Sequence, residues 1–159
     1  IWERLKRAGT RNVQVHRPGE DLAGLAERMD RVLVDAPCTG SGVWRRKPDA
    51  KWRLAADALD KRLAEQSAVL DEACRFVRPG GFLVYVTCSV LPEENEAQVD
   101  AFLERHGDGF RPVSAGEAWE ELFGVDGPKP WSADGDSLTL TPAATGTDGF
   151  FLAVLERVR

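Results

Sequence analysis

The sequence is poor in cysteine, in histidine and in long apolar runs, and each scarcity excludes a class of protein. Its 159 residues include three cysteines and two histidines. An odd number of cysteines without CxxC spacing argues against a disulfide framework and against a four-ligand zinc site. No apolar run approaches the ~20 residues of a membrane-spanning helix, and no basic start followed by an apolar stretch marks a signal peptide. The sequence therefore predicts a protein of the reducing cytoplasm, with no membrane anchor and no metal.

The composition is that of one folded domain, with 43% hydrophobic and 30% charged residues. The chain begins at Ile1, without an initiator Met and already in a helix-like pattern, so we expect a piece of a longer protein. The net charge of −5 argues against a nucleic-acid partner. Residues 93–136 carry most of the excess, with 12 acidic against 3 basic side chains.

One short segment has the opposite character. Residues 43–53 (VWRRKPDAKWR) hold five basic side chains and one acid, with Trp44 and Trp52 interleaved. Such a segment can bind phosphates and stack on bases. From composition alone, a solvated loop with two partly buried tryptophans is the simpler interpretation.

Alternating strand and helix patterns predict an α/β fold. Apolar runs predict strands, and helical spacing predicts helices, in the order helix 1–8, strand 12–16, helix 20–28, strand 31–36, helix 54–77, strand 82–90 and helix 92–105. This order predicts a mostly parallel sheet with right-handed crossovers. Strands at 137–142 and 149–158, joined by a TGTDG turn, predict a closing antiparallel hairpin. Residues 107–136 read as loop, with one helical turn at 116–123.

Two of the predicted parallel strands end in chemically unusual residues. The first leads into DAPC (35–38) and the second ends in TCS (87–89). Neighbouring parallel strands lie ~4.8 Å apart, and ligands bind beyond their carboxyl ends. Cys38 and Cys88 are therefore expected side by side, with Asp35 in the same crevice. A carboxylate and two thiols at one sheet edge suit covalent catalysis better than packing.

Four segments carry a resemblance to a known family. DAPCTGSG (35–42), RRKPDAKW (45–52), PGGFLVYVTCSVLPEEN (79–95) and TDGFF (147–151) resemble, in this order, signature segments of the Sun/RsmB-type RNA cytosine-C5 methyltransferases. The pairing of DAPC with TCS is specific, whereas PGG before an apolar strand occurs in many class I methyltransferases. The resemblance implies the C-terminal part of a Rossmann-like class I methyltransferase domain, with helices on both faces of the sheet. Residues 1–159 would then be a partial catalytic domain without the first strands.

The resemblance also implies a reaction. A methyl group passes from S-adenosylmethionine to carbon 5 of a cytosine in RNA, and ribosomal RNA is preferred because TCSVLPEEN is similar to the bacterial ribosomal members. Cys88 is implied as the nucleophile that adds to carbon 6, and Cys38 as the residue that helps to release the product. Asp35 is implied to hydrogen-bond the base around N3 and the exocyclic amine. The basic side chains implied to lie near the flipped nucleotide and its phosphates are Arg45, Arg46 and Lys51.

The cofactor site is where the sequence departs from the family pattern. The family binds S-adenosylmethionine mostly through a first strand and its Gly-rich loop, and no strand–GxGxG–helix unit exists in this sequence. By resemblance, Asp35 and Pro37 contact the methionine end of the cofactor. Glu20 or Asp21 is expected to replace the acidic residue that the family places on the ribose. The chain is thus expected to retain the catalytic half and to lack the principal cofactor half.

Two other classes of function stay open. Without its own cofactor site, the chain can be a catalytically incompetent fragment that serves as an RNA-binding or scaffold module. A cysteine-dependent hydrolase or redox protein would need a base such as histidine near Cys88, and neither His16 nor His106 follows a central strand. A Cys38–Cys88 disulfide is sterically conceivable, but in a reducing compartment it would be an artefact of oxidation.

The remaining notable residues are given structural roles. Cys74 falls on the apolar face of a predicted helix and is interpreted as core. Glu93 and Glu94 are interpreted as first-turn helix charges, with closeness to the active site as the alternative. Asp148 is interpreted as part of a hairpin turn, and the protein is expected to be a monomer.

Overall fold

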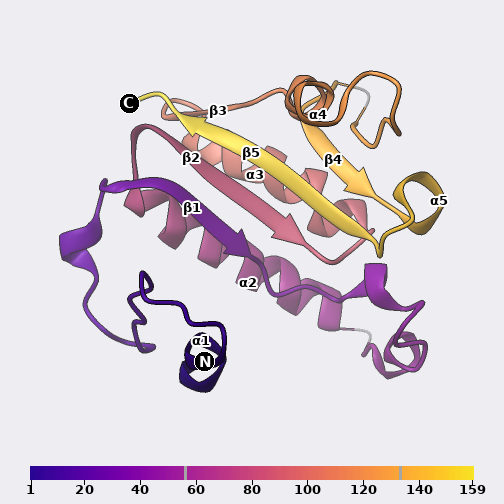
Figure 1. Ribbon diagram of the computed structural model, residues 1–159, viewed down its shortest axis with the longest axis horizontal. Coiled ribbons are helices and arrows are strands. Elements are labelled where there is room, and N and C mark those ends of the chain that lie inside the picture. Colours follow the sequence, from indigo (N-terminus) through magenta and orange to yellow (C-terminus); the bar gives the residue numbers. More distant parts are fainter. Residues whose placement is uncertain (56, 133) are drawn as a thin grey trace.

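A mixed five-stranded sheet forms the centre of the computed structural model, which describes residues 1–55, 57–132 and 134–159 (Figure 1). Its strands are β1 (Met29–Asp35), β2 (Val77–Thr87), β3 (Phe110–Pro112), β4 (Ser137–Leu140) and β5 (Phe150–Arg157). The strand order is β1-β2-β5-β3, and β4 also pairs with β5. β1 and β2 are parallel, whereas β5 is antiparallel to β2, β3 and β4.

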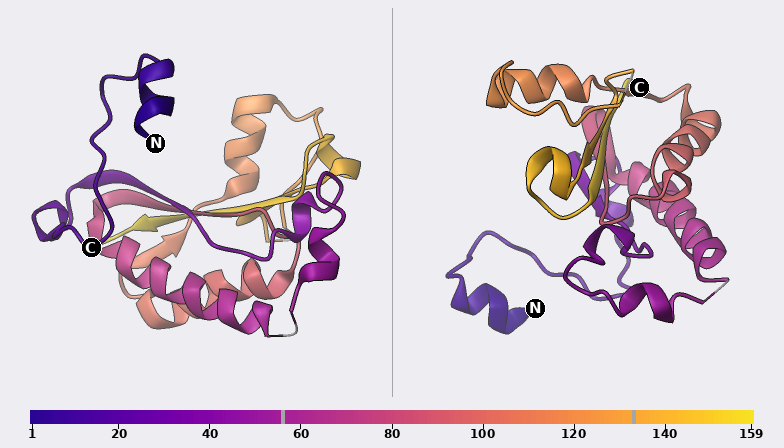
Figure 2. Two further views of the ribbon diagram at one scale, coloured as in Figure 1. Left: turned by 90° about the horizontal axis from the view of Figure 1, so that it is seen from below. Right: turned by 90° about the vertical axis from the view of Figure 1, so that its right-hand side faces the viewer.

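Helices cover both faces of the sheet (Figure 2). The helices α2 (Ala58–Ala73) and α3 (Glu96–His106) lie together on one face, and α4 (Ala115–Phe123) lies on the other. Short helical turns fill the connections: η1 (Ala23–Leu25), η2 (Ser41–Val43), η3 (Ala50–Arg53), η4 (Cys74–Phe76), η5 (Pro92–Glu94) and α5 (Pro142–Thr145). The N-terminal helix α1 (Trp2–Arg7) stands apart from the sheet and buries none of its residues.

The core lies between the sheet and the pair α2 and α3. Alternate residues of the central strands β2 and β5 are fully buried and those between them are partly exposed, so one face of the sheet carries most of the core. The largest fully buried apolar side chains are Leu70, Leu83, Tyr85, Phe102, Phe151 and Leu155. Cys74 is 7% exposed and belongs to the same cluster, so its interpretation as a core residue is confirmed.

The predicted Rossmann-like α/β fold and its closing hairpin are confirmed, with three corrections. The sheet in this chain is mixed rather than mostly parallel, since only β1 and β2 run in the same direction. Residues 12–16, all of them described, form no strand; Val13 is 48% exposed, so the alternating pattern buries no face. The helix predicted at 20–28 shrinks to η1, in line with the low helix propensity of Gly24.

Two element boundaries also differ from the prediction. The Pro79-Gly80-Gly81 segment lies inside β2 rather than before it. The pairing with β1 shifts there, and Gly80 adopts a positive φ of 69° that other residues rarely take. The segment predicted as loop at 107–136 contains β3 as well as α4, because β5 offers a partner edge far along the chain.

Candidate active site

The two thiols meet at the carboxyl ends of β1 and β2. Asp35 is in register with Val86, so the parallel strands end at the same level. Cys38 and Cys88 follow these ends, and their Sγ atoms lie 3.3 Å apart. Both side chains are half-buried and neither is part of a disulfide. The predicted juxtaposition of the two cysteines is therefore present.

The close contact makes the two thiols chemically unequal. A hydrogen bond from the Cys38 thiol is the main cause that lowers the pKa of Cys88 to about 7, from an ordinary value of 9.0. The same bond, together with burial, raises the pKa of Cys38. A proton shared between two sulfurs stabilises a single thiolate, so the two thiols titrate as a pair, and the opposite shifts favour Cys88 as the thiolate.

Asp35 and Pro37 lie on the segment that leads to the first thiol. Asp35 is exposed at the end of β1, and its charge is among the causes that raise the pKa of Cys88. The carbonyl oxygen of Pro37 accepts a hydrogen bond of 2.9 Å from Nε2 of Gln66 on α2. Asp35 is therefore a solvent-accessible carboxylate near Cys88, and the bond from Gln66 ties the backbone of Pro37 to α2.

The loop after Cys38 is held by the buried carboxylate of Glu94, which is interpreted from sequence as a helix charge, with closeness to the active site as the alternative. Glu94 is 0% exposed and accepts hydrogen bonds from the backbone N–H of Thr39 (2.8 Å) and from its hydroxyl (2.6 Å). A third bond, of 3.1 Å, comes from Nε2 of Gln66. Glu94 and Gln66 thus fasten the DAPC segment to η5 and α2.

Hydroxyl and amide groups hold the segment that follows Cys88. Thr87 donates to Oδ1 of the buried Asn95 at 2.6 Å, and Asn95 donates to the carbonyl of Ser89 at 3.1 Å. The hydroxyls of Ser41 and Ser89 lie 2.8 Å apart and link the two thiol-bearing segments. Buried polar groups with satisfied partners make a rigid network, so the position of Cys88 is fixed from both sides.

The connection between β4 and β5 packs directly on this site. Gly149 donates its N–H to the carbonyl of Gly42 (2.8 Å), and Gly42 donates to the carbonyl of Cys88 (3.0 Å). A Cβ on Gly149 would lie 2.6 Å from the Cα of Gly42, so only glycine allows this approach. The TDGFF segment is therefore part of the active-site wall.

Two of the predicted substrate-binding arginines converge on one carboxylate. Arg45 Nη2 lies 3.0 Å from Oδ1 of Asp148, and Arg46 donates from Nε to the other oxygen of Asp148. The third predicted basic residue, Lys51, places its ammonium over the ring of Trp52 at 4.5 Å from the centroid. Trp52 is 79% exposed, so this aromatic and basic surface faces solvent.

The residues predicted for the cofactor do not gather in one place. Asp21 accepts a bond from the N–H of Ala23 (2.9 Å) and lines a cavity of about 200 Å³ with residues at the end of α2, near the amino end of β1. Asp35 marks the opposite, carboxyl end of that strand. A separate groove of about 340 Å³ runs along the outer side of β1 against α2.

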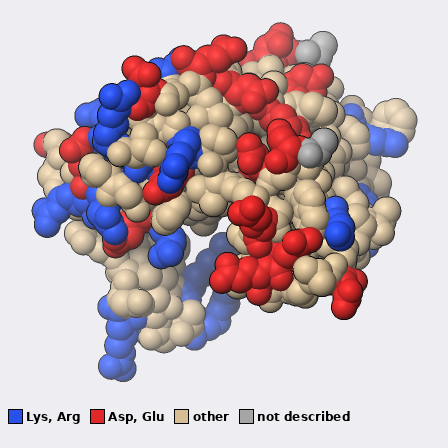
Figure 3. Space-filling model, turned by 90° about the horizontal axis from the view of Figure 1, so that it is seen from above, with Lys and Arg blue, Asp and Glu red and all other residues tan. Residues whose placement is uncertain are grey.

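Charge is distributed unevenly over the surface. Figure 3 shows Asp and Glu side chains gathered across much of one face of the molecule. The basic segment 43–53, which follows the loop after Cys38, supplies five positive side chains. Within the described residues, no helix is long and apolar enough to cross a membrane, and no three or more His, Cys, Asp or Glu cluster as a metal site would require.

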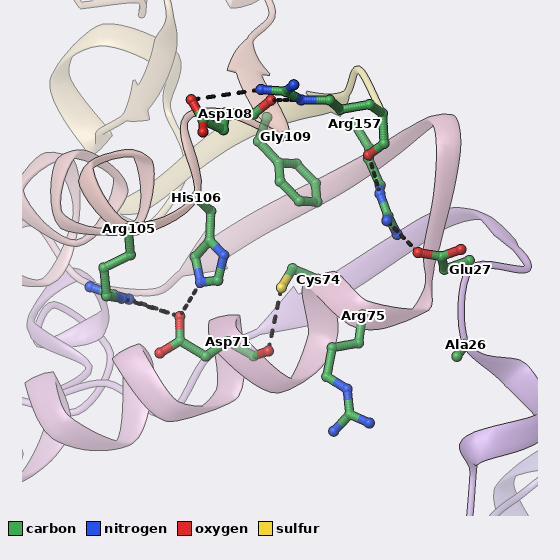
Figure 4. A pocket seen from close by; sticks show the side chains of 12 residues that line it. Ala26, Glu27, Asp71, Cys74, Arg75, Arg105, His106, Asp108, Gly109 and Arg157 are labelled. Carbon is green, nitrogen blue, oxygen red and sulfur yellow. Dashed lines mark hydrogen bonds and ion pairs between the residues drawn. The ribbon is translucent and has the colours of Figure 1, made fainter.

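A cavity of about 620 Å³ lies at the other end of the sheet, away from the thiols (Figure 4). His106 and Arg105 both contact Asp71 there, at 2.9 and 3.0 Å, and Arg157 pairs with Glu27. The second histidine, His16, pairs with Glu20. Both histidines therefore have carboxylate partners of their own, and neither partner carboxylate belongs to the thiol site.

Sequence reasoning gave Glu94 a place near the site only as an alternative, and it did not predict the partners of Glu94 or of Asp148. Glu94 and Asp148 each sit inside a segment that carries the resemblance, PGGFLVYVTCSVLPEEN and TDGFF. The resemblance of those segments to the family was the one indication that the two residues matter. The residues that Glu94 and Asp148 contact lie 55 and about 100 residues away along the chain.

Comparison with known proteins gives a consistent result. The family described as 16S rRNA methyltransferase RsmB/F matches residues 1–156. Proteins named ribosomal RNA small subunit methyltransferase B are 40% identical over 82% of this chain in Vibrio cholerae and 38% identical over 98% in Enterobacter sp. strain 638. The structure of NSun6 from Pyrococcus horikoshii with SFG covers 99% of this chain with a TM-score of 0.72 and 26% identity, across 38% of its own length. The chain spans 26% and 33% of the lengths of the two sequence relatives.

Proposed function

We propose that this chain, which belongs to the 16S rRNA methyltransferase RsmB/F family, is the catalytic part of an enzyme that methylates carbon 5 of a cytosine in RNA. The observation that carries the proposal is the 3.3 Å contact of the two thiols at the carboxyl ends of β1 and β2. The relatives named for the small ribosomal subunit make ribosomal RNA the proposed substrate. The enzyme is proposed to act as a monomer in the cytoplasm, without a metal.

Cys88 is the proposed nucleophile. Carbon 5 of cytosine is a poor nucleophile until a thiolate adds to carbon 6 and makes the ring enamine-like. The lowered pKa of Cys88, about 7, provides this thiolate at neutral pH without a histidine base. Asp35, exposed beside the thiols, is proposed to hydrogen-bond N3 and the exocyclic amine of the base and to stabilise the adduct.

Cys38 is proposed to act in product release. Once the sulfur of Cys88 is bonded to carbon 6, it no longer holds a negative charge. The largest cause that raises the pKa of Cys38, its hydrogen bond to Cys88, is then removed, and the Cys38 thiol loses its proton more readily and can act as a base. Removal of the proton from carbon 5 returns the electron pair to the ring, and the bond between carbon 6 and the Cys88 sulfur breaks.

The described residues fit one edge of a cofactor site. S-adenosylmethionine supplies the methyl group in this chemistry, and SFG, with which the NSun6 structure was solved, is its analogue. Asp35 and Pro37, at and just after the carboxyl end of β1, are proposed to hold the methionine end. Asp21 lies toward the other end of that strand. We propose that the Gly-rich cofactor loop belongs to residues outside this chain, and that 1–159 is a partial catalytic domain.

Covalent trapping tests the proposed function. The full-length protein is incubated with S-adenosylmethionine and RNA containing 5-fluorocytosine, and the protein–RNA adduct is resolved on a denaturing gel. We expect an adduct in the wild type and in the core variant Cys74→Ala, and none in Cys88→Ala. An adduct that persists in Cys88→Ala but is lost in Cys38→Ala would reverse the two roles.

The same protein tests the release step on ordinary RNA. Cys38→Ala is expected to remain attached to methylated RNA, because the proton on carbon 5 is removed slowly. Normal turnover in Cys38→Ala would contradict the release role. An RNA-binding protein that forms no adduct in any variant would instead be the catalytically incompetent module.

A further inference from the structure

We propose that Asp148 is a positioning residue that holds Arg45 and Arg46 together as a clamp for one backbone phosphate of the RNA substrate. The proposal rests on the proposed function for the identity of its ligand, an RNA phosphodiester. It assigns a role to the acidic residue of the TDGFF segment, which the sequence pattern placed only in a turn.

The geometry of the three side chains supports a clamp. One carboxylate oxygen of Asp148 pairs with Arg45 at 3.0 Å, and the other pairs with Arg46. The Asp148 side chain is 10% exposed, whereas the two arginine side chains are 59% and 57% exposed. A guanidinium has five N–H donors, and each arginine uses one of its nitrogens to bind Asp148. The remaining N–H groups of each guanidinium fork are exposed and can donate to phosphate oxygens.

The clamp is tied to the reactive sulfur through the backbone. Gly149, next to Asp148, bonds to Gly42, and Gly42 bonds to the carbonyl of Cys88. The close approach of Gly149 to Gly42 leaves no room for a side chain between them. Two backbone hydrogen bonds therefore connect Gly149, the neighbour of Asp148, to Cys88 through Gly42. A phosphate held there would set the position of its nucleotide relative to the nucleophile.

Electrostatics favours the same role. Two guanidinium groups that converge on one point repel each other, and the carboxylate between them offsets this repulsion. The group of three keeps a charge of about +1, which suits a phosphodiester of charge −1. A nearby ion pair gives a contrast: Arg53 pairs with Asp49 four residues away, and both side chains are mostly exposed. Such a local surface pair fixes little.

Binding of RNA to variants that cannot form the adduct tests the clamp without the chemistry. In the full-length Cys88→Ala protein, affinity for a fluorescent single-stranded oligoribonucleotide is measured by anisotropy at several salt concentrations. Asp148→Asn is expected to weaken binding about 5- to 20-fold and to reduce the slope of log K against log salt by about 0.7, one phosphate contact. Asp49→Asn, the matched control, is expected to stay within about twofold of the parent.

Two further variants separate positioning from charge. The double variant R45K/R46K keeps both charges but loses the fork, and we expect it to bind as weakly as Asp148→Asn. In a background that already carries Arg45→Ala and Arg46→Ala, Asp148→Asn is expected to add no further loss. The thermal unfolding midpoint of each variant is recorded, and R45K/R46K provides the decisive comparison if Asp148→Asn unfolds.

Three results would overturn the proposal. Tighter RNA binding by Asp148→Asn would show that the carboxylate competes with phosphate. Unchanged binding by both Asp148→Asn and R45K/R46K would show that the fork has no role. A further loss from Asp148→Asn without the arginines would show that Asp148 acts through the fold. Since none of these measurements needs an adduct, failure of the clamp is distinguishable from failure of the methylation mechanism.

Discussion

At the scale of single residues, the site generates a thiolate with another thiol as its hydrogen-bond donor. The Sγ atoms of Cys38 and Cys88 lie 3.3 Å apart, the lowered pKa of Cys88 favours Cys38 as the donor, and the two histidines of the chain are paired with Glu20 and Asp71 instead. A cysteine hydrolase needs a base that removes a proton from its nucleophile. The arrangement therefore favours a nucleophile that already lacks its proton over one activated by histidine.

The pH dependence of alkylation tests this activation. The rate at which iodoacetamide modifies Cys88 follows its thiolate fraction. Because the folded pKa is lowered from 9.0 to about 7, the reactive form is present above about pH 7 and is lost as the pH falls through it. Mass spectrometry of the labelled peptide is expected to give a midpoint near 7 in the wild type. In Cys38→Ala the midpoint is expected to rise toward the ordinary value.

Two controls test whether the hydrogen bond with Cys38, rather than a general change in the site, lowers the pKa of Cys88. Cys38→Ser restores a hydroxyl donor and is expected to bring the midpoint part of the way back. Cys74, whose pKa is raised by burial, serves as an internal reference and is expected to label slowly at every pH. Equal midpoints in the wild type and Cys38→Ala would contradict the assigned hydrogen bond.

At the scale of elements, η5 acts as the anchor of the catalytic loop through Glu94. Its carboxylate accepts two bonds from Thr39 and one from Gln66, and it is 0% exposed. Removing such an acceptor leaves buried donors without partners, which costs about 1–3 kcal/mol for each group. The anchor therefore contributes to folding stability as well as to the position of Cys38.

Substitution of the anchor has a graded outcome. Glu94→Ala is expected to lower the free energy of unfolding by about 2–4 kcal/mol in urea denaturation, because several donors lose their acceptor at once. Glu94→Gln is expected to cost about 1 kcal/mol, since its oxygen can accept from both N–H groups while the Thr39 hydroxyl turns to accept from the amide. Glu93→Ala, at the exposed neighbour, is the control and is expected to stay within about 0.5 kcal/mol. Equal losses in Glu93→Ala and Glu94→Ala would contradict the anchor.

The elements also show what the sequence could predict. Strands β1 and β2 are recognisable in the sequence as apolar runs. The expectation that they are parallel neighbours was enough to predict that Cys38 and Cys88 lie close together. The bulge at Pro79-Gly80-Gly81 was not predictable, because its shape depends on the pairing of β2 with β1. The same holds for β3, three residues long, which is a strand only because β5 lies beside it.

The candidate site, like the fold, has features that the local sequence predicts and features that depend on the tertiary structure. The candidate residues could be predicted because each belongs to a local sequence motif: a cysteine after a strand, or an arginine pair in a basic segment. The bonds of Glu94 to Thr39 and of Asp148 to Arg45 join segments 55 and 103 residues apart. Such contacts depend on the tertiary fold, and no periodicity in the chain specifies them.

At the scale of the whole molecule, net charge is a poor guide to the partner. The chain carries −5, yet the acids are concentrated in residues 93–136 and the basic segment 43–53 adjoins the thiols. Attraction to phosphate acts over about 8–10 Å at physiological salt, so under the proposed function the local field around Arg45 and Arg46 matters more for the approach of RNA than the net charge does.

The outer edge of β1 bears on how tightly this chain can bind S-adenosylmethionine. Among the described residues no strand pairs with that edge, Leu33 is 68% exposed, and the groove beside it is lined largely by apolar side chains. A cofactor site at a parallel sheet needs the Gly-rich loop after a strand as well as the strand ends. This chain supplies Asp35 and Pro37 at one strand end, and its sequence contains no such loop unit.

Calorimetric titration of the chain 1–159 with S-adenosylmethionine tests this limit. We expect a dissociation constant weaker than about 1 mM, equivalent to less than about 4 kcal/mol, because one edge of a site leaves most of the cofactor in water. The same preparation is expected to bind the fluorescent oligoribonucleotide in a salt-dependent manner, which shows that it is folded and that the basic segment is intact. A micromolar constant for S-adenosylmethionine alongside normal RNA binding would show that the groove on β1 already forms a complete cofactor site. Weak binding of the cofactor with intact binding of RNA would instead separate the two halves of the reaction, with the nucleophile and the phosphate contacts in this chain and the methyl donor held by other residues.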